Sequence, residues 1–519
     1  MSKHLKSISV ISFLTVISRI LGVFRDSLAA AVFGTSWLYS AFITAFSLPN
    51  LFRRLLAEGA LTAAFVPTLQ EELHFSNRRG AFALLSKVTS WLLVVTGSLV
   101  AIAMYLFHFA RRLPGHNEKW YVAADLAVLL FPYLAFICLA AACNATLNVL
   151  QRFTEPALSP IWLNLAMILS LGGAGLHFAH TPMGEIHWLV VGVLAGGFLQ
   201  MAVPAGVLIV EGWRPRFDLE LAPRVREIAM LMAPGLFGTA IYQINILVQR
   251  LLAFSLDDSS VTQLFNGNRL MEFPIGVFAI AVSTVVYPLI ARHAVEGNLE
   301  GMAEDFRKGL RLILIINVPA AAGLAMLSGP IVNLVYRHGH FTVADARILT
   351  PLVALFAIGM PFFSVVNLTV RAFYAVKDTA TPVKVAAIDF VANLILSVVL
   401  MRWLGARGLV LSSTTAIIIQ ALLLQRALVR RLPGMTFRPL WKSIGKVLVG
   451  TAVMTATVLA GRMILVHASA HQRVADLLSV LVLIPVGILV YALTLWLVRV
   501  EGREELAGFL LKKFRPVAK

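Results

Sequence analysis

The chain has 519 residues, of which 59% are hydrophobic and only 13% are charged, and its mean hydropathy is +0.83. This composition excludes a soluble globular domain, in which about a quarter of the residues are charged. The net charge of +18 is spread along the sequence without a compact basic domain, so we expect membrane lipids with anionic headgroups as partners and no nucleic acid.

Long apolar stretches follow one another along the whole sequence, separated by Gly, Pro and clusters of charge. A helix that crosses a bilayer needs about 20 mostly apolar residues. We therefore predict an all-α polytopic membrane protein with fourteen transmembrane helices. They are expected at about 7–33, 37–69, 81–110, 121–150, 157–179, 186–210, 223–254, 261–290, 307–336, 343–374, 381–403, 407–430, 440–467 and 474–499.

The distribution of Lys and Arg between these stretches predicts the orientation. The first stretch is too long and too charged for a cleavable signal peptide. With the N-terminus inside, the cytoplasmic termini and loops hold 28 of the 44 Lys and Arg residues, and the opposite face holds nine. Cytoplasmic loops of membrane proteins carry this excess. We expect both termini to be cytoplasmic.

Prolines indicate an internal duplication. Four pairs recur at offsets of about 220 to 230 residues: Pro49 and Pro274, Pro67 and Pro288, Pro132 and Pro361, and Pro156 and Pro382. Chance matches are the alternative reading. A duplication predicts an N-lobe at 1–218 and a C-lobe at 219–435, each with six spans. Copies with an even number of spans insert the same way up, so two parallel lobes would face a central cavity, and residues 436–519 would add two C-terminal helices.

Charged residues inside the first two predicted spans are the strongest functional signal. A cation in the middle of a bilayer costs about 3 kcal/mol or more, so such residues usually mark a polar cavity. Arginine keeps its proton, and its planar fork matches phosphate oxygens. We therefore predict a site for a phosphate-bearing lipid or solute. The residues are Arg19, Arg25, Arg53 and Arg54, accompanied only by Asp26 and Glu58.

Helical spacing suggests how these charges are partly neutralised. Arg19 and Asp26 are seven residues apart and share a face, whereas Arg25 is expected to point elsewhere unless the helix bends near Gly22. Arg54 and Glu58 are spaced i, i+4, and Arg269 and Glu272 are spaced i, i+3. The alternative is that all are buried salt bridges that hold helices together. Pro49 and Asn50 put a predicted kink just before the second pair of arginines.

Several motifs, in order, resemble one family. They are Ser18-Arg19-Ile20-Leu21-Gly22, Arg25-Asp26, Leu48-Pro49-Asn50-Leu51-Phe52-Arg53-Arg54, Ala57-Glu58-Gly59-Ala60, Phe65-Val66-Pro67, Arg269-Leu270-Met271-Glu272-Phe273-Pro274 and Thr381-Pro382-Val383-Lys384. The sequence is similar in these motifs to MurJ, also called MviN, a family of bacterial lipid II flippases in the wider group that includes MATE exporters.

The resemblance implies an inner-membrane flippase for lipid II, the undecaprenyl-diphosphate-linked precursor of peptidoglycan, with a role in cell-wall biogenesis and cell shape. It places Arg19, Arg25, Arg53 and Arg269 in the cavity, with Ser18, Asp26, Pro49, Asn50, Arg54, Glu58 and Glu272 around them. It also implies that the last two helices form a groove for the lipid tail. Proteins of cell-wall synthesis and division are candidate partners.

The sequence departs from many relatives at two positions. Ser40 and Ser47 stand where those relatives have an acidic residue and a lysine. A gating role that depends on this charge pair is therefore in doubt for this chain. Arg250 and Arg371 lie near span ends and are expected to snorkel to the interface.

No organic cofactor is expected. Transport is expected to be driven either by a sodium ion or by the membrane potential. Asp389, Asn393 and Ser397 recur at i, i+4 and i+8 on one face of the eleventh span. With Thr414 and Thr415 of the next span, their oxygens form a candidate sodium site. The membrane potential is the alternative, because it does work on any charge that moves across the bilayer.

The same residues distinguish a lipid II flippase from other possible functions. A flippase for another polyprenyl-diphosphate-linked glycan would need the same arginines, whereas a MATE-like exporter of cationic drugs would favour unpaired carboxylates. An enzyme acting on lipid-linked sugars would need catalytic acids, and the obvious pair, Asp257-Asp258, is read as turn residues. No G-x-S-x-G, Walker A or H-E-x-x-H motif is present. A transporter, not an enzyme, is therefore expected. A membrane scaffold without transport activity remains a further alternative, and it would tolerate loss of the arginines.

Overall fold

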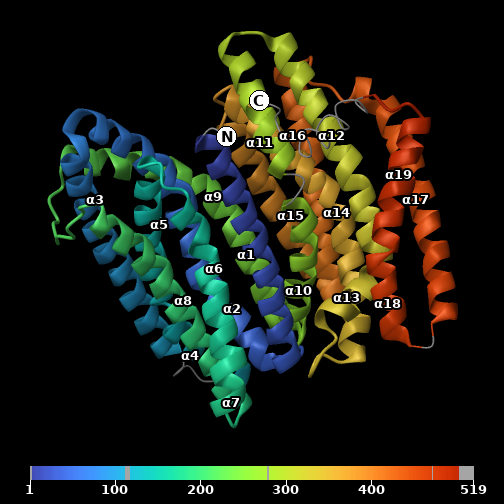
Figure 1. Ribbon diagram of the computed structural model, residues 1–519, viewed down its shortest axis with the longest axis horizontal. Coiled ribbons are helices and arrows are strands. Elements are labelled where there is room, and N and C mark those ends of the chain that lie inside the picture. The colour runs from blue at the N-terminus through green and yellow to red at the C-terminus, as the bar shows by residue number, and fades with distance from the viewer. Residues whose placement is uncertain (1–2, 111–116, 277–279, 470, 502–519) are drawn as a thin grey trace. The chain divides into compact units, whose positions relative to one another are not determined.

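The computed structural model describes residues 3–110, 117–276, 280–469 and 471–501, and its regular structure in these ranges is helical throughout (Figure 1). Ten helical segments there are long and apolar enough to cross a membrane: Ala64–Phe109, Glu118–Val149, Thr154–Phe178, Pro182–Val210, Leu299–Met326, Val343–Ala375, Ala380–Leu404, Ala406–Arg431, Trp441–Ala468 and Gln472–Leu497. The all-α polytopic class is thus confirmed. The full count of fourteen stays a prediction, and the four further stretches, 7–33, 37–69, 223–254 and 261–290, are those that carry most of the intramembrane arginines.

The chain forms two compact units, which are described separately. The first comprises residues 1–262 and 338–341. Its helices are α1 (Lys3–Phe33), α2 (Trp37–Phe52), the π-helical segment η1 (Arg53–Ala60), α3 (Leu61–Ala110), α4 (Glu118–Leu130), α5 (Tyr133–Val149), α6 (Thr154–Ile168), the π-helical segment η2 (Leu169–Gly175), α7 (Leu176–Phe178), α8 (Pro182–Val210) and α9 (Pro223–Leu256).

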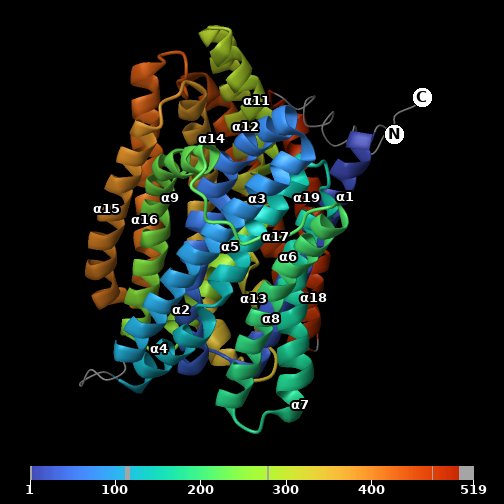
Figure 2. The same cartoon turned by 90° about the vertical axis from the view of Figure 1, so that its left-hand side faces the viewer.

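Within the first unit, α3 packs on α5, α5 and α6 pack on α8, and α1 packs on α6 (Figure 2). Phe65, Leu85 and Leu147 are fully buried where α3 packs on α5. Cys138 and Cys143 are free and buried on α5.

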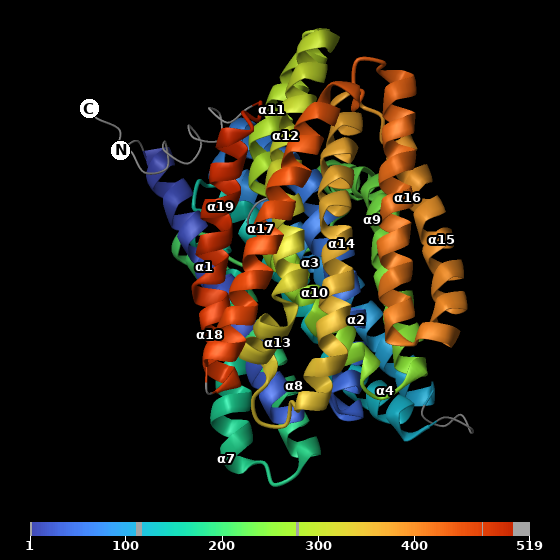
Figure 3. The ribbon, with the colours of Figure 1, turned by 90° about the vertical axis from the view of Figure 1, so that its right-hand side faces the viewer.

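The second unit comprises residues 263–337 and 342–519. Its helices are α10 (Ser260–Pro274, which begins in the first unit), α11 (Ile280–Val295), α12 (Leu299–Met326), α13 (Ser328–Tyr336), α14 (Val343–Ala375), α15 (Ala380–Leu404), α16 (Ala406–Arg431), the short 3-10 helix η4 (Arg438–Leu440), α17 (Trp441–Ala468), α18 (Gln472–Leu481) and α19 (Leu483–Leu497). Helix α14 packs on α12 and α16, and α17 packs on α12 and α19 (Figure 3).

Helix α9 shows that compact units and duplicated halves need not coincide. The predicted duplication assigns α9 to the C-lobe, but its side chains pack on α2, η1 and α3 of the first unit. The predicted lobe boundary between residues 218 and 219 concerns the repeat in the sequence and stays a prediction.

Matching turns support the duplication locally. Gln151, between α5 and α6, and Lys377, between α14 and α15, both adopt left-handed backbone conformations, with φ of 61° and 60°. Each turn closes with the same backbone hydrogen bond to the residue five positions earlier, from Arg152 N to the Leu147 carbonyl at 2.8 Å and from Asp378 N to the Phe373 carbonyl at 2.9 Å. This is the Schellman closure of a helix C-terminus. The two turns are about 226 residues apart, the same offset as Pro156 and Pro382.

Candidate functional site

Helix α2 changes its backbone geometry just before the paired arginines. Pro49 lies inside the helix, where a proline removes one backbone hydrogen bond and crowds the carbonyl four residues earlier. The π-helical segment Arg53–Ala60 follows directly, and its end is marked by a hydrogen bond from Leu61 N to the Leu56 carbonyl. Such π-helical turns are rare and concentrate at functional sites. The predicted kink and the predicted arginines therefore coincide.

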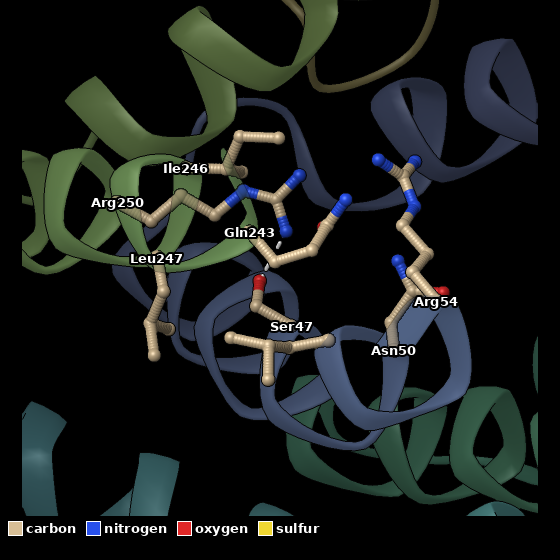
Figure 4. Close-up of a pocket in the computed structure, with 8 residues that line it drawn as sticks. Ser47, Asn50, Arg54, Gln243, Ile246, Leu247 and Arg250 are labelled. Carbon is tan, nitrogen blue, oxygen red and sulfur yellow. Dashed lines mark hydrogen bonds between the residues drawn. The ribbon is translucent and has the colours of Figure 1, made fainter. Parts of the chain in front are cut away.

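A polar recess lies between α2 and α9 of the first unit (Figure 4). It is lined by Ser47, Asn50, Leu51 and Arg54 from α2 and η1, and by Gln243, Ile246, Leu247 and Arg250 from α9. Each set follows the i, i+3, i+4, i+7 spacing of one helical face. The lining thus offers two guanidinium groups, two amides and one hydroxyl, and none of these eight side chains is a carboxylate. The recess is net positive.

Arg250 closes one side of this recess. Its guanidinium group donates a hydrogen bond to the Ser47 hydroxyl (Figure 4), and that hydroxyl in turn donates to the Ile43 carbonyl at 2.5 Å. The expectation that Arg250 snorkels to the interface was therefore wrong. Its position seven residues after Gln243 turns it toward α2, where a polar acceptor is available.

Arg54 closes the other side and makes no hydrogen bond or ion pair with a side chain that the structure describes. The side chain of its predicted partner Glu58 lies outside the described residues, so the i, i+4 pair stays a prediction. Arg53 donates from Nε to the side-chain amide oxygen Oδ1 of Asn50 at 2.7 Å. The Asn50 side-chain NH2 group has no hydrogen-bond partner among the residues that the structure describes, so it can donate into the recess.

Arg25 and Asp26 belong to a buried network between α1 and α6. Arg25 donates to the Asp26 carboxylate at 2.9 and 2.6 Å and to the side-chain amide oxygen Oδ1 of Asn164 at 3.0 Å. The Asn164 amide donates to the Ser18 carbonyl at 3.0 Å. We expected Arg25 to point away from Asp26, and this was wrong: both side chains turn into the same helix interface, because Asn164 supplies a polar partner there.

Arg19 differs from Arg25 in its surroundings. It is half-buried, nearly two helical turns before Arg25, and has no hydrogen bond or ion pair with another residue in the described part of the chain. Of the two arginines of α1, Arg19 is therefore the one with a guanidinium group available to a ligand in this conformation.

Arg269 lies on α10 in the second unit. Its guanidinium group is 3.3 Å from the Glu272 carboxylate and lies over the Phe265 ring at 5.7 Å. Asn268 donates to the same carboxylate at 2.9 Å. The predicted i, i+3 pair is thus confirmed as a contact. The gathering of Arg269 with the arginines of the first unit around one ligand stays a prediction.

The candidate sodium ligands lie on two helices of the second unit. Asn393 and Ser397 are buried on α15 and are 3.3 Å apart through a hydrogen bond. Thr414 of α16 donates its hydroxyl to the Leu355 carbonyl at 3.3 Å. Asp389 precedes Asn393 by one turn and is half-buried. Sodium binding by this group stays a prediction.

Asp257 and Asp258 are turn residues, as the sequence suggested. The Asp257 carboxylate accepts hydrogen bonds from the backbone of Ser259 at 2.8 Å and of Ser260 at 2.6 Å, at the start of α10. Burial opposes ionisation of Asp257, but these bonds and that from the Ser260 hydroxyl outweigh it and lower its pKa. The Asp258 carbonyl accepts from the Ser40 hydroxyl at 2.7 Å. Ser40 therefore ties α2 to the end of α9.

Comparison with known proteins identifies the family. The family profile described as "Lipid II flippase MurJ" matches residues 29–494. A probable lipid II flippase MurJ of Vibrio cholerae is 30% identical over 475 residues, which cover 88% of this chain and 88% of that protein. The chain belongs to the MurJ family.

Solved structures agree with the MurJ assignment. A lipid II flippase MurJ in an inward closed conformation is 25% identical, covers 93% of this chain and 97% of that chain, and superimposes with a TM-score of 0.75. An inward-facing multidrug resistance transporter of the MATE family is 12% identical, covers 83% of this chain and 98% of that chain, and has a TM-score of 0.66. The second likeness shows the fold alone. The first match confirms the MurJ fold, and the second shows that a MATE transporter has a similar fold.

Sequence reasoning missed Gln243 and Arg250 of this MurJ-family chain as recess residues. Gln243 is buried, with 9% of its surface exposed. The sequence did contain a signal for this face of the helix, because Gln243 precedes Arg250 by seven residues and both therefore lie on the same side. Periodicity can align the two on one face, but it cannot say which helix that face meets.

Proposed function

We propose that this chain is a flippase that moves lipid II from the cytoplasmic to the periplasmic leaflet of the bacterial inner membrane. The observation that carries the proposal is the recess between α2 and α9 of a MurJ-family chain, with two guanidinium groups and no carboxylate in its lining. A diphosphate headgroup is dianionic or more and needs cationic donors when it leaves water. A drug exporter for cations would need the opposite charge.

The proposed mechanism is alternating access. Arg19, Arg25, Arg53, Arg54 and Arg269 bind the diphosphate, and Ser18, Asp26, Pro49, Asn50, Glu58 and Glu272 support or gate them. Arg25 must exchange its contact with Asp26 and Asn164 for the substrate, so its pairing differs between the two states. Transport requires two conformations that differ in their affinity for substrate or driving ion. The polyprenyl tail stays in lipid, beside α17 and α19.

The finer assignments extend this proposal. Both termini face the cytoplasm, supported by the excess of Lys and Arg in the loops on that side. Either a sodium ion held by Asp389, Asn393 and Thr414 or the membrane potential drives the cycle. Proteins of cell-wall synthesis and division are proposed partners.

The test uses cells depleted of their own lipid II flippase and scores the transbilayer appearance of lipid II. The parent chain is compared with Arg19→Ala, Arg25→Ala and Arg269→Ala at matched membrane levels, and Arg473→Ala at an exposed position in the first turn of α18 serves as the control. We expect the parent and the control to restore flipping and the three variants to fail. A correctly inserted parent that restores none would contradict lipid II as the substrate and point to another polyprenyl-diphosphate-linked glycan.

A further inference from the structure

The lining of the recess favours one particular kind of group. Two arginines from different helices flank it, and the amides of Gln243 and Asn50 lie on the same side as their guanidinium groups in Figure 4. Guanidinium and amide groups together offer N–H donors that match phosphate oxygens. The apolar neighbours Leu51, Ile246 and Leu247 keep the local dielectric low, which strengthens any charge pairing there.

The size of the recess limits what it can hold. Its cavity volume is about 20 Å³, far below the roughly 300–1,000 Å³ of sites that enclose a whole drug-sized ligand. A disaccharide-pentapeptide does not fit this space. The recess takes about one water-sized group, such as one oxygen of a phosphate, with the rest of the phosphate and its molecule outside.

We propose that Arg54, Arg250, Gln243 and Asn50 form an anion subsite that binds one phosphate group between α2 and α9. This proposal rests on the proposed function, because the subsite would hold part of the substrate headgroup. It adds Arg250 and Gln243 to the residues that contact the headgroup. The Ser47 hydroxyl holds Arg250 while the subsite is empty, and a phosphate oxygen replaces Ser47 as the acceptor.

The phosphate group that binds this subsite could come from two sources, the diphosphate of a lipid or inorganic phosphate in water. Binding is therefore measured on the purified full-length chain in lipid nanodiscs in two arms, one with undecaprenyl diphosphate in the nanodisc and one with inorganic diphosphate in solution. The variants are Arg250→Gln and Arg54→Gln. Arg371→Gln is the matched control, because Arg371, like Arg250, lies near the end of a predicted span but packs over Tyr287 of the second unit.

We expect each recess variant to weaken binding about ten- to hundredfold, since one charge-assisted contact is lost, and the control to bind like the parent. Arg250→Lys should recover part of the affinity, because it restores the charge but not the fork. An effect in the lipid arm alone assigns the subsite to a lipid headgroup. An effect in both arms assigns it to phosphate in either form.

Ser47→Ala separates ligand binding from a structural role of Arg250. If Arg250 only fastens α9 to α2, Ser47→Ala should lower the unfolding temperature and the affinity as Arg250→Gln does. If Arg250 binds phosphate, Ser47→Ala should keep the parental affinity or improve it. Parental affinity of Arg250→Gln in both arms would overturn the subsite even if the chain flips lipid II. Conversely, arginine-dependent diphosphate binding by a chain that flips no lipid II would retain the subsite and reject the substrate.

Discussion

Arg25 and Asp26 are consecutive residues of α1, yet their side chains meet in the interface with α6, where guanidinium and carboxylate are 2.6 Å apart. Both are buried, with side-chain exposures of 10% and 2%. Removing one member of a buried pair leaves an uncompensated charge, which costs far more than the loss of an exposed pair.

Asp26→Asn should therefore destabilise the protein by about 3 kcal/mol or more. The measurement is the thermal unfolding midpoint of the purified protein in detergent. Glu296→Gln, which removes one partner of the exposed pair with Arg292, is the control and should change stability by about 1 kcal/mol or less. Equal midpoints for the two variants would contradict the buried network.

Asn164→Ala should act through the same network. Asn164 accepts from Arg25 and donates to the Ser18 carbonyl, so its loss leaves two buried groups without their partner and should cost about 1–3 kcal/mol. Because it shares Arg25 with Asp26, the double variant Asp26→Asn with Asn164→Ala should be less destabilised than the sum of the single changes. Strict additivity in thermal unfolding would show that the two residues act separately.

Gly339→Ala should weaken the contact between the 338–341 loop and α1. Gly339 has a φ of +55°, and an added Cβ would lie 2.2 Å from the Ala31 carbonyl oxygen, beside the hydrogen bond from His340 N to that oxygen at 2.7 Å. The left-handed conformation alone costs a non-glycine residue about 1–2 kcal/mol, so a clear drop in unfolding temperature is expected.

Gly323→Ala is the matched glycine control. An added Cβ meets no atom within 4 Å there, and alanine favours a helix over glycine by about 1 kcal/mol. It should leave the unfolding temperature unchanged or raise it. A similar loss in both variants would argue against the clash at Ala31.

We predict that the ionisation of Asp378 makes the stability of the folded protein depend on pH. Burial opposes its ionisation, but hydrogen bonds from the Thr381 hydroxyl and backbone, with the Arg431 guanidinium nearby, outweigh it and hold its pKa below the usual range. A lowered pKa in the folded state contributes stability that is present above the unfolded value of about 3.9 and is lost as pH falls through the folded value.

Unfolding temperatures of the parent and of Asp378→Asn, measured from pH 3 to pH 8, test this. The parent should be more stable than the variant by a constant amount above about pH 5, and the difference should shrink below about pH 4. A difference that grows on acidification would show the opposite sign of the pKa shift.

The sequence was sufficient for features that arise within one helix or one turn. Hydropathy over about 20 residues is a local property, so the polytopic class followed from composition. The spacing of Arg269 and Glu272 placed both on one face of α10, and the contact is present. Asp257 and Asp258 were read as turn residues, because an aspartate beside serines at a helix start accepts nearby backbone N–H groups.

Only the tertiary structure decided which helix each polar face meets. Arg250 and Ser47 are 203 positions apart in the sequence and Arg25 and Asn164 are 139 apart, and neither partner could be chosen from spacing. The physical reason is that helical periodicity fixes a direction about one axis and carries no information about the neighbour. In lipid, apolar faces gain little by choosing one helix over another, so the neighbours of α1, α2 and α9 depend on close packing and on the few polar groups that must find one another.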